Sequence, residues 1–189
     1  TSRGFGLTGV STCNAYYCNA LNCTNNGFVS NATGAMLFFC TATGCSATEA
    51  FDVCNAYGCV AFNNTFTGFE PATSTRTLHV RCISYDNSGA TSDGFNCSSN
   101  QALFLQCVAY NNGRDGFRTQ AAQQTYINCI AEGQTAGFGF NNAGDPSSLA
   151  YFNCAGFDNN SGDIDLSTGN FALNQGFITG SASFFTNPG

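Results

Sequence analysis

Two aspartates and two arginines in the middle of this 189-residue chain have the residue types that acid–base or metal chemistry needs. Asp93 and Asp115 each stand directly before a Gly-Phe pair, and Arg114 and Arg118 flank the second aspartate. Two carboxylates at close range can bind Ca²⁺ or divide the acid and base roles on a glycosidic bond. The sequence therefore offers Asp93, Asp115, Arg114 and Arg118 as candidate catalytic residues and the two aspartates as candidate calcium ligands.

The stretch around Asp115 belongs to a repeat. "CVAYNNGRDGF" at 107–117 matches "CVAFNNTFTGF" at 59–69 in length and in its Cys, Ala, Asn-Asn and Gly-Phe positions. Asp93 and Asp115 fill the same slot in adjacent repeats, so their carboxyl groups are expected roughly 5 Å apart in stacked coils. An Asp or Asn before Gly also satisfies the amides of its own turn, and this structural role is the interpretation we favour for the pair.

Aligning the repeats produces columns of equivalent residues. A cysteine column consists of Cys18, Cys40, Cys59, Cys82, Cys107, Cys129 and Cys154. Two residues earlier is an apolar column, expected to face the core, of Tyr16, Phe38, Tyr57, Val80, Leu105, Ile127 and Phe152. Two residues later is a small column, expected at a corner, of Ala20, Ala42, Ala61, Ser84, Ala109, Ala131 and Gly156. An aromatic stack is expected from Phe5, Phe28, Phe51, Phe69, Phe95, Phe117 and Phe138, closed by Ile164.

The columns predict the fold. Successive column cysteines are 19 to 25 residues apart, which suits three short strands and their turns in each coil. Apolar residues recur with a period near two, and Gly, Asn, Asp and Ser cluster between them, whereas an antiparallel sandwich or barrel would not repeat one frame in register. We expect an all-β parallel β-helix of about seven to eight coils over residues 1–164, with a last coil and a C-terminal cap in 165–189.

The units "TYINCIAE" and "FLQCVAYNNGRDGF" resemble the right-handed parallel β-helix repeats of the pectate-lyase-like superfamily, and "NNGRDGF" is most similar to coils of family nine polysaccharide lyases. In that family aspartates near this motif bind the calcium that holds an acidic sugar, a lysine removes the proton, and an asparagine ladder lies at a tight turn that the cysteine column here is expected to take over. This chain has no lysine, and Asn96 and Arg118 stand where good calcium-binding coils are acidic. An arginine base in its place would need a strongly perturbed guanidinium.

Composition limits the partners. The net charge is −6 and only 8% of residues are charged, which disfavours nucleic acid and anionic membranes. The longest apolar run, "AMLFFC", is too short to cross a bilayer. Residues 4 and 5 already form the Gly-Phe of a coil, so we expect the chain to contact copies of itself through end-to-end or lateral packing.

Twelve cysteines and one histidine are the remaining reactive groups. Parallel stacked side chains sit too far apart for ideal disulfides, so the column cysteines are expected to be buried thiols, while Cys23 and Cys45 are placed to pair. The CxxC spacing of zinc sites is absent. His79 fills a slot held by Leu37, Phe104 and Tyr126 in other coils, which favours packing over catalysis.

Two classes of function remain open. The first, which we favour, is a non-catalytic extracellular, cell-surface or virion-surface solenoid that acts as a structural, adhesive or filament-forming module and contacts copies of itself or polysaccharide. The second is a polysaccharide lyase or glycoside hydrolase acting on an acidic polysaccharide, with Ca²⁺ as its one candidate cofactor. A column of Phe62, Tyr85 and Tyr110 serves either as an exposed strip for sugar rings or as an interior stack, because the adjacent turn interrupts the alternation of faces.

Overall fold

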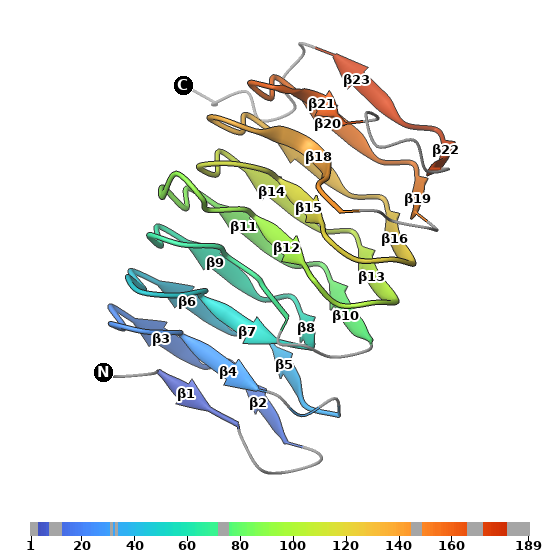
Figure 1. Ribbon diagram of the computed structural model, residues 1–189. Helices are drawn as coiled ribbons and strands as arrows, with labels where there is room; N and C mark the ends of the chain where they lie inside the picture. The colour runs from blue at the N-terminus through green and yellow to red at the C-terminus, as the bar shows by residue number, and fades with distance from the viewer. Residues whose placement is uncertain are drawn as a thin grey trace.

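The computed structural model describes residues 4–7, 13–30, 32, 34–71, 76–144, 149–165 and 172–180. Within them the chain forms a parallel β-solenoid of about seven turns that contains no helix. Figure 1 shows the coils stacked from β1 (Phe5–Gly6) to β23 (Ile178–Gly180). All strand pairs in these residues are parallel, which confirms the predicted solenoid and excludes the antiparallel alternatives.

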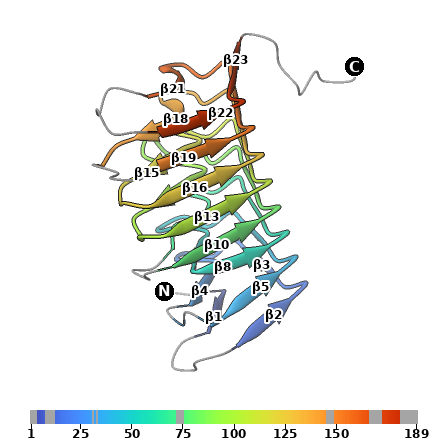
Figure 2. The same ribbon diagram turned by 90° about the vertical axis from the view of Figure 1, so that its right-hand side faces the viewer.

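Each coil contributes one strand to each of three sheets. Sheet A has two parts that meet through bridges at Phe69, and comprises β1, β4 (Phe28–Ser30), β7 (Phe51–Val53), β12 (Phe95–Cys97), β15 (Phe117–Thr119), β18 (Phe138–Asn142) and β21 (Gly162–Ile164). Sheet B comprises β2 (Asn14–Tyr16), β5 (Met36–Phe38), β8 (Asn55–Tyr57), β10 (Thr77–Val80), β13 (Ala102–Leu105), β16 (Gln124–Ile127), β19 (Leu149–Phe152) and β22 (Ala172–Gln175). Sheet C comprises β3 (Asn19–Leu21), β6 (Thr41–Thr43), β9 (Val60–Phe62), β11 (Ile83–Tyr85), β14 (Val108–Tyr110), β17 (Ile130–Glu132), β20 (Ala155–Phe157) and β23. Figure 2 looks onto the strands of sheet B.

Residues with left-handed backbone make the two sharp corners of each coil. The corner between sheets B and C uses the residue before each column cysteine, for example Arg81 (φ 54°) and Gln106 (φ 55°). The corner after sheet C uses Asn63, Asp86 and Asn111 in successive coils, with φ between 49° and 53°. Asn and Asp tolerate this conformation better than other side-chain-bearing residues, which explains why they recur at the second corner.

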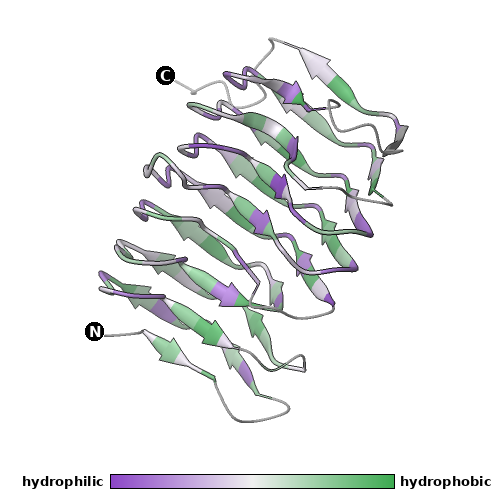
Figure 3. Cartoon of the chain, in the orientation of Figure 1, coloured by the Kyte–Doolittle hydropathy of each residue, from purple (hydrophilic) through white to green (hydrophobic). Residues whose placement is uncertain are grey.

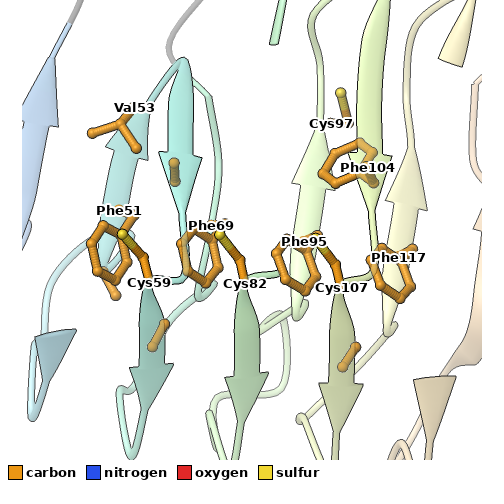
Figure 4. Packing of buried hydrophobic residues seen from close by; sticks show 14 of the residues in the cluster. Phe51, Val53, Cys59, Phe69, Cys82, Phe95, Cys97, Phe104, Cys107 and Phe117 are labelled. Atoms are coloured by element: carbon orange, nitrogen blue, oxygen red, sulfur yellow. The ribbon is translucent and has the colours of Figure 1, made fainter. Parts of the chain in front are cut away.

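The aromatic stack forms the centre of the core. In Figure 4 the rings of Phe51, Phe69, Phe95 and Phe117 lie one above the other, with the column cysteines beside them. Neighbouring rings have centroids 4.6 to 4.9 Å apart and lie within 10° of parallel. Phe104 of sheet B meets two of these rings edge-on. The core is therefore a continuous structure shared by successive coils.

The apolar column does not face this core, and that prediction was wrong. Leu105 and its equivalents are half-buried or exposed on the outside of sheet B, and Tyr16 is 54% exposed. The inward side chains are one residue earlier: Ala15, Leu37, Ala56, His79, Phe104, Tyr126 and Tyr151, all buried. The left-handed residue between the strand and the cysteine shifts the alternation, so the column cysteine and the side chain two residues before it lie on different sides.

The small column lies in the middle of the strands of sheet C, and not at a corner as predicted. Its side chains point inward against the glycine of each Gly-Phe pair. A Cβ added to Gly116 would lie 2.8 Å from Cβ of Ala131, and one on Gly94 would lie 2.9 Å from Cβ of Ala109. Small residues are needed here because sheets A and C approach each other closely.

A ladder of amide side chains follows the second corner, one residue after each left-handed residue. Asn64, Asn87 and Asn112 are buried, and Asn87 Nδ2 donates to Asn112 Oδ1 at 2.8 Å. The backbone amide of Asn112 donates in turn to Gln134 Oε1 at 3.0 Å. The cysteine column therefore does not stand in for an amide ladder; the chain has both, at different corners.

The aromatic stack continues through Phe140 and not through Phe138. Phe117 pairs with Phe140, and their ring centroids are 4.9 Å apart, whereas Phe138 is only half-buried. The two phenylalanines are two residues apart and share a face of the strand, so alternation alone does not distinguish them. In the segment 165–189, predicted to hold the last coil and a cap, β22 and β23 extend sheets B and C, and the rest of the segment falls largely outside the described residues.

Candidate functional site

The four candidate residues come together where the chain turns into sheet A. Asp93 and Asp115 lie in adjacent coils as predicted, and the backbone amide of Asp115 donates to Asp93 Oδ1 at 3.1 Å. Both side chains are buried, with 0% and 1% of the residue exposed. Their carboxylates face the turns of the protein itself and not the solvent.

The chain supplies a hydrogen-bonding partner to each aspartate oxygen. Arg114 binds Asp93 with two nitrogens, its Nε donating to Oδ1 at 2.7 Å and its Nη2 to Oδ2. The backbone amide of Phe138 and Nδ2 of Asn141 donate to Asp115, each at 2.8 Å. These contacts are the ones expected of a structural network that holds two turns together.

The electrostatics of the network keep Arg114 charged. Its hydrogen bonds to Asp93 raise the pKa of the guanidinium above its ordinary value, and a charged guanidinium has no electron pair with which to accept a proton. Burial raises the pKa of Asp93 even though Arg114 opposes this shift. Arg118 lies farther out, with Nη1 3.9 Å from Asp115 Oδ2, and its buried Nε has no hydrogen-bond partner.

Three carboxylates near the same sheet, Glu49, Asp52 and Glu70, were not among the residues predicted from the sequence. Glu70 follows the bridge residue Phe69, and burial followed by the charge of nearby Glu49 raises its pKa to about 7. Asp52 and Asp93 add to this shift, while a hydrogen bond from Asn96 opposes it. Glu70 stands directly after the phenylalanine of its coil. The repeat alignment contains this position in every coil, so a comparison of the residues there could have identified Glu70. A carboxyl group that is partly protonated near neutral pH is a candidate general acid.

Asn96 holds the same position, after the phenylalanine, in the coil that follows Glu70, and it pairs with Arg118 of the next coil. Oδ1 of Asn96 is buried without a hydrogen-bond partner. Across the described ranges of the chain, no three His, Cys, Asp or Glu side chains are grouped so that they could hold a metal ion. Calcium binding by Asp93 and Asp115 therefore remains a prediction from the sequence.

His79 and the cysteines take structural positions. His79 is fully buried between the rings of Phe69 and Phe104, as its slot predicted. All twelve cysteines are free thiols, and ten of them are buried. Cys23 and Cys45 are neighbours in the first two coils, in line with the amide ladder, but are not bonded as a disulfide. Burial raises the pKa of Cys97 to about 11, which keeps this thiol protonated and unreactive.

The column of Phe62, Tyr85 and Tyr110 lies on the outside of sheet C, half-buried. The rings of Phe62 and Tyr85 stack on each other, with centroids 5.0 Å apart and planes within 2° of parallel. The facing sides of the Phe62 and Tyr85 rings therefore cover each other. The strip is a half-buried aromatic border on the outside of sheet C.

The outside of sheet B is a continuous, mainly apolar surface along the described strands. Its outward side chains are Asn14, Tyr16, Met36, Phe38, Asn55, Tyr57, Leu78, Val80, Leu103, Leu105, Thr125, Ile127, Ala150 and Phe152. None of these residues carries a charge, but the guanidinium of Arg81, at the adjoining corner, lies over the ring of Tyr57 and donates to its hydroxyl group at 3.1 Å. Sheet C adds a second outward row of Val60, Ile83, Val108, Ile130, Ala155 and Ile178. Figure 3 shows the hydrophilic residues gathered along the turns, between the more apolar strands.

No helix in the described part of the chain has the length and apolar character needed to cross a membrane. Comparison of the chain with models of protein families, with curated proteins and with solved structures finds no match.

Proposed function

We propose that this protein is a non-catalytic structural module that assembles side by side with copies of itself at an extracellular, cell or virion surface. The observation that carries the proposal is the largely apolar outer face of the strands of sheet B. Burying a continuous apolar surface of this kind is favourable, and such patches often mark interaction sites. Flat sheets of identical strands also suit face-to-face packing, in which side chains interdigitate across about 10 Å.

The size of the surface favours an array over a closed dimer. Eight strands spaced about 4.8 Å apart, each about 10 to 13 Å long, give a projected area of roughly 350 to 450 Å² for sheet B. A stable interface needs about 800 Å² from each partner. One face alone supplies only about half of this area, so a single contact is weak and a copy is held in an assembly by the sum of its contacts through sheets B and C. Because they lie on different sides of a corner, engaging both joins each copy to more than one neighbour.

Charge-introducing substitutions on the two faces test this proposal. Leu103→Glu on sheet B and Ile83→Glu on sheet C each place a carboxylate in the packed surface, where it would be costly to bury. Ser98→Glu adds the same charge at an exposed turn and is the matched control. We expect sedimentation velocity and negative-stain electron microscopy to show laterally packed assemblies for the wild type and the control, and mainly single solenoids for the two face variants. A wild-type protein that stays monomeric at high concentration overturns the proposal, and filaments that persist in both face variants indicate end-to-end contacts instead.

The enzymatic alternative is favoured by one observation, the raised pKa of Glu70 beside other carboxylates. One protonated and one ionised carboxyl group are the pair that glycoside hydrolysis uses. Against it, Glu49, Asp52 and Glu70 together repel an acidic polysaccharide unless a cation bridges them. Incubation with polygalacturonate, with and without Ca²⁺, distinguishes the functions, since a lyase produces unsaturated ends, a hydrolase produces only new reducing ends, and a structural module produces neither. Glu70→Gln and Asp115→Asn show whether any activity belongs to these residues. If neither product forms, the likeness to pectate-lyase-like coils concerns their architecture and not their reaction.

A further inference from the structure

A polar hollow of about 510 Å³ lies on the outside of the turns that follow sheet C. Its lining comes from four successive coils and consists of Asn63, Asp86, Ser88, Asn111, Gly113 and Thr135. Asn63, Asp86 and Asn111 are the left-handed corner residues of three neighbouring coils. The other three stand two residues beyond a corner residue, so the hollow follows two parallel columns along the solenoid axis.

Gly113 stands between Ser88 and Thr135 in the second column and lines the hollow without a side chain. A Cβ at Gly113 would collide with the carbonyl oxygen of Gly89, in the longer turn of the preceding coil. The packing of the turns therefore excludes any larger residue here. Ser88 and Thr135 lie two coils apart, roughly 10 Å, and line the hollow on either side of Gly113.

The side chains around the hollow are suited to hydroxyl groups. Asn111 Nδ2 donates to Asp86 Oδ1 at 2.6 Å, which orients the carboxylate toward its neighbours in the column. Thr135 Oγ1 donates to the carbonyl oxygen of Gly113 at 3.0 Å, so its lone pairs remain as acceptors. The lining contains amides, hydroxyls and one carboxylate, and its single charge is negative. Together with the net charge of −6, this lining disfavours anionic ligands.

An apolar border accompanies the polar columns. Phe62, Tyr85 and Tyr110 directly precede the three corner residues and lie half-buried on the outside of sheet C. Hydrogen-bonding groups beside an apolar strip match a pyranose ring, which has hydroxyl groups at its rim and C–H groups on its faces. The repeat of the columns, about 4.8 Å per coil, presents similar groups at regular intervals along an extended chain.

We propose that this groove binds a neutral oligosaccharide lying along the solenoid axis, with Asp86 accepting hydrogen bonds from sugar hydroxyls and the Asn63 and Asn111 amides donating to them. The ligand class differs from the acidic polysaccharide of the enzymatic alternative. The groove lies at the edge between sheets C and A, so its lining is separate from the outer face of sheet B. Lateral packing through sheet B therefore leaves the groove open, whereas packing through sheet C brings a neighbouring copy beside it.

Titration calorimetry of the wild-type protein with hexasaccharides of β-1,4-glucan, β-1,4-mannan and β-1,4-xylan, and with hexagalacturonate, tests the proposal. We expect at least one neutral hexasaccharide to bind and hexagalacturonate not to bind. Asp86→Ala should weaken binding about tenfold or more, because a hydrogen bond to a charged group is the stronger kind, and Asn111→Ala should weaken it about threefold or more, because its amide forms a neutral hydrogen bond. Asn22→Ala changes the corner residue of the first coil, outside the groove, and should leave the affinity unchanged.

Two further measurements keep the result interpretable. Circular dichroism confirms that each variant folds, and amide chemical shifts of residues 63, 86 and 111 report whether the sugar contacts this groove. Absence of binding to all three neutral sugars overturns the proposal, and so does preference for hexagalacturonate or an affinity that Asp86→Ala does not change.

Discussion

His79 is an ionisable side chain that the fold keeps neutral. It is fully buried, its Nε2 lies 3.4 Å from the carbonyl oxygen of Val53, and its Nδ1 has no hydrogen-bond partner. Burial lowers its pKa from the ordinary 6.5 to about 4. Between these two values the unfolded chain binds a proton that the folded chain does not. His79 therefore costs stability progressively as the pH falls from about 6.5 toward 4.

Replacing His79 by Phe, the residue at the equivalent position 104, should remove this pH dependence. The variant also removes the unpaired Nδ1, so we expect it to be about 1 kcal/mol more stable than the wild type at pH 7. Its advantage should grow as the pH falls to 5. Urea denaturation of both proteins at pH 5, 6 and 7 measures the difference in their free energies of unfolding. Glu70 and Asp93 contribute a pH dependence of the opposite sign to that of His79, but they are present in both proteins, so their contributions cancel in this difference. An advantage that is the same at every pH contradicts a titrating, buried His79.

At the scale of the strand, β13 shows how one residue of register decides what a side chain does. Phe104 is fully buried against the aromatic stack, and Leu105 next to it lies on the outside of sheet B. The sequence analysis assigned Leu105 to the core, where a charge would unfold the neighbouring coils. In the structure, a charge at Leu105 meets solvent or another copy of the chain.

Alanine substitutions in β13 separate the two positions. Phe104→Ala leaves a cavity between the rings of successive coils, and we expect it to lower the free energy of unfolding by about 3 to 5 kcal/mol. Leu105→Ala should cost about 1 kcal/mol in the dispersed protein, because its side chain is only half-buried. Chemical denaturation at low protein concentration measures both values. Equal losses, or a larger loss for Leu105→Ala, would restore the original assignment of the core.

At the scale of the whole molecule, charge and apolar surface are kept apart. The chain has a net charge of −6, while the described strands of sheet B have no charged residue on their outer side, where the guanidinium of Arg81 from the adjoining corner lies over Tyr57. Copies that approach each other therefore repel through distant carboxylates and attract through the apolar faces. Salt weakens the first effect, since the Debye length falls from about 10 Å at 0.1 M to about 3 Å at 1 M. Apolar contacts are not weakened in this way.

Lateral assembly should consequently increase with ionic strength. Raising NaCl from about 0.1 M to about 1 M should shift the wild-type sedimentation profile toward larger species, while Leu103→Glu should remain dispersed. Dissociation of the wild-type assemblies by salt would indicate an interface held by ion pairs, which the proposed face does not contain.

The repeating frame of the sequence was enough to predict a parallel solenoid, its three short strands per coil, the buried cysteine column and most of the aromatic stack. These features are predictable because stacked coils place equivalent residues above one another, so each column reports one environment several times. The same alignment placed Asp93 and Asp115 in adjacent coils, as the structure has them.

Only the tertiary structure decided which way the columns face and which residues meet across coils. A single left-handed residue at each corner reverses the alternation of side chains, and the sequence does not mark it when that residue is Arg81 or Gln106. This is why the column of Leu105 was assigned to the wrong side. Three features join residues of different coils: the contact between Arg114 and Asp93, the charges that raise the pKa of Glu70, and the packing of Gly113 against Gly89. Their geometry depends on turns of unequal length, whose shapes are set by packing and not by the local sequence.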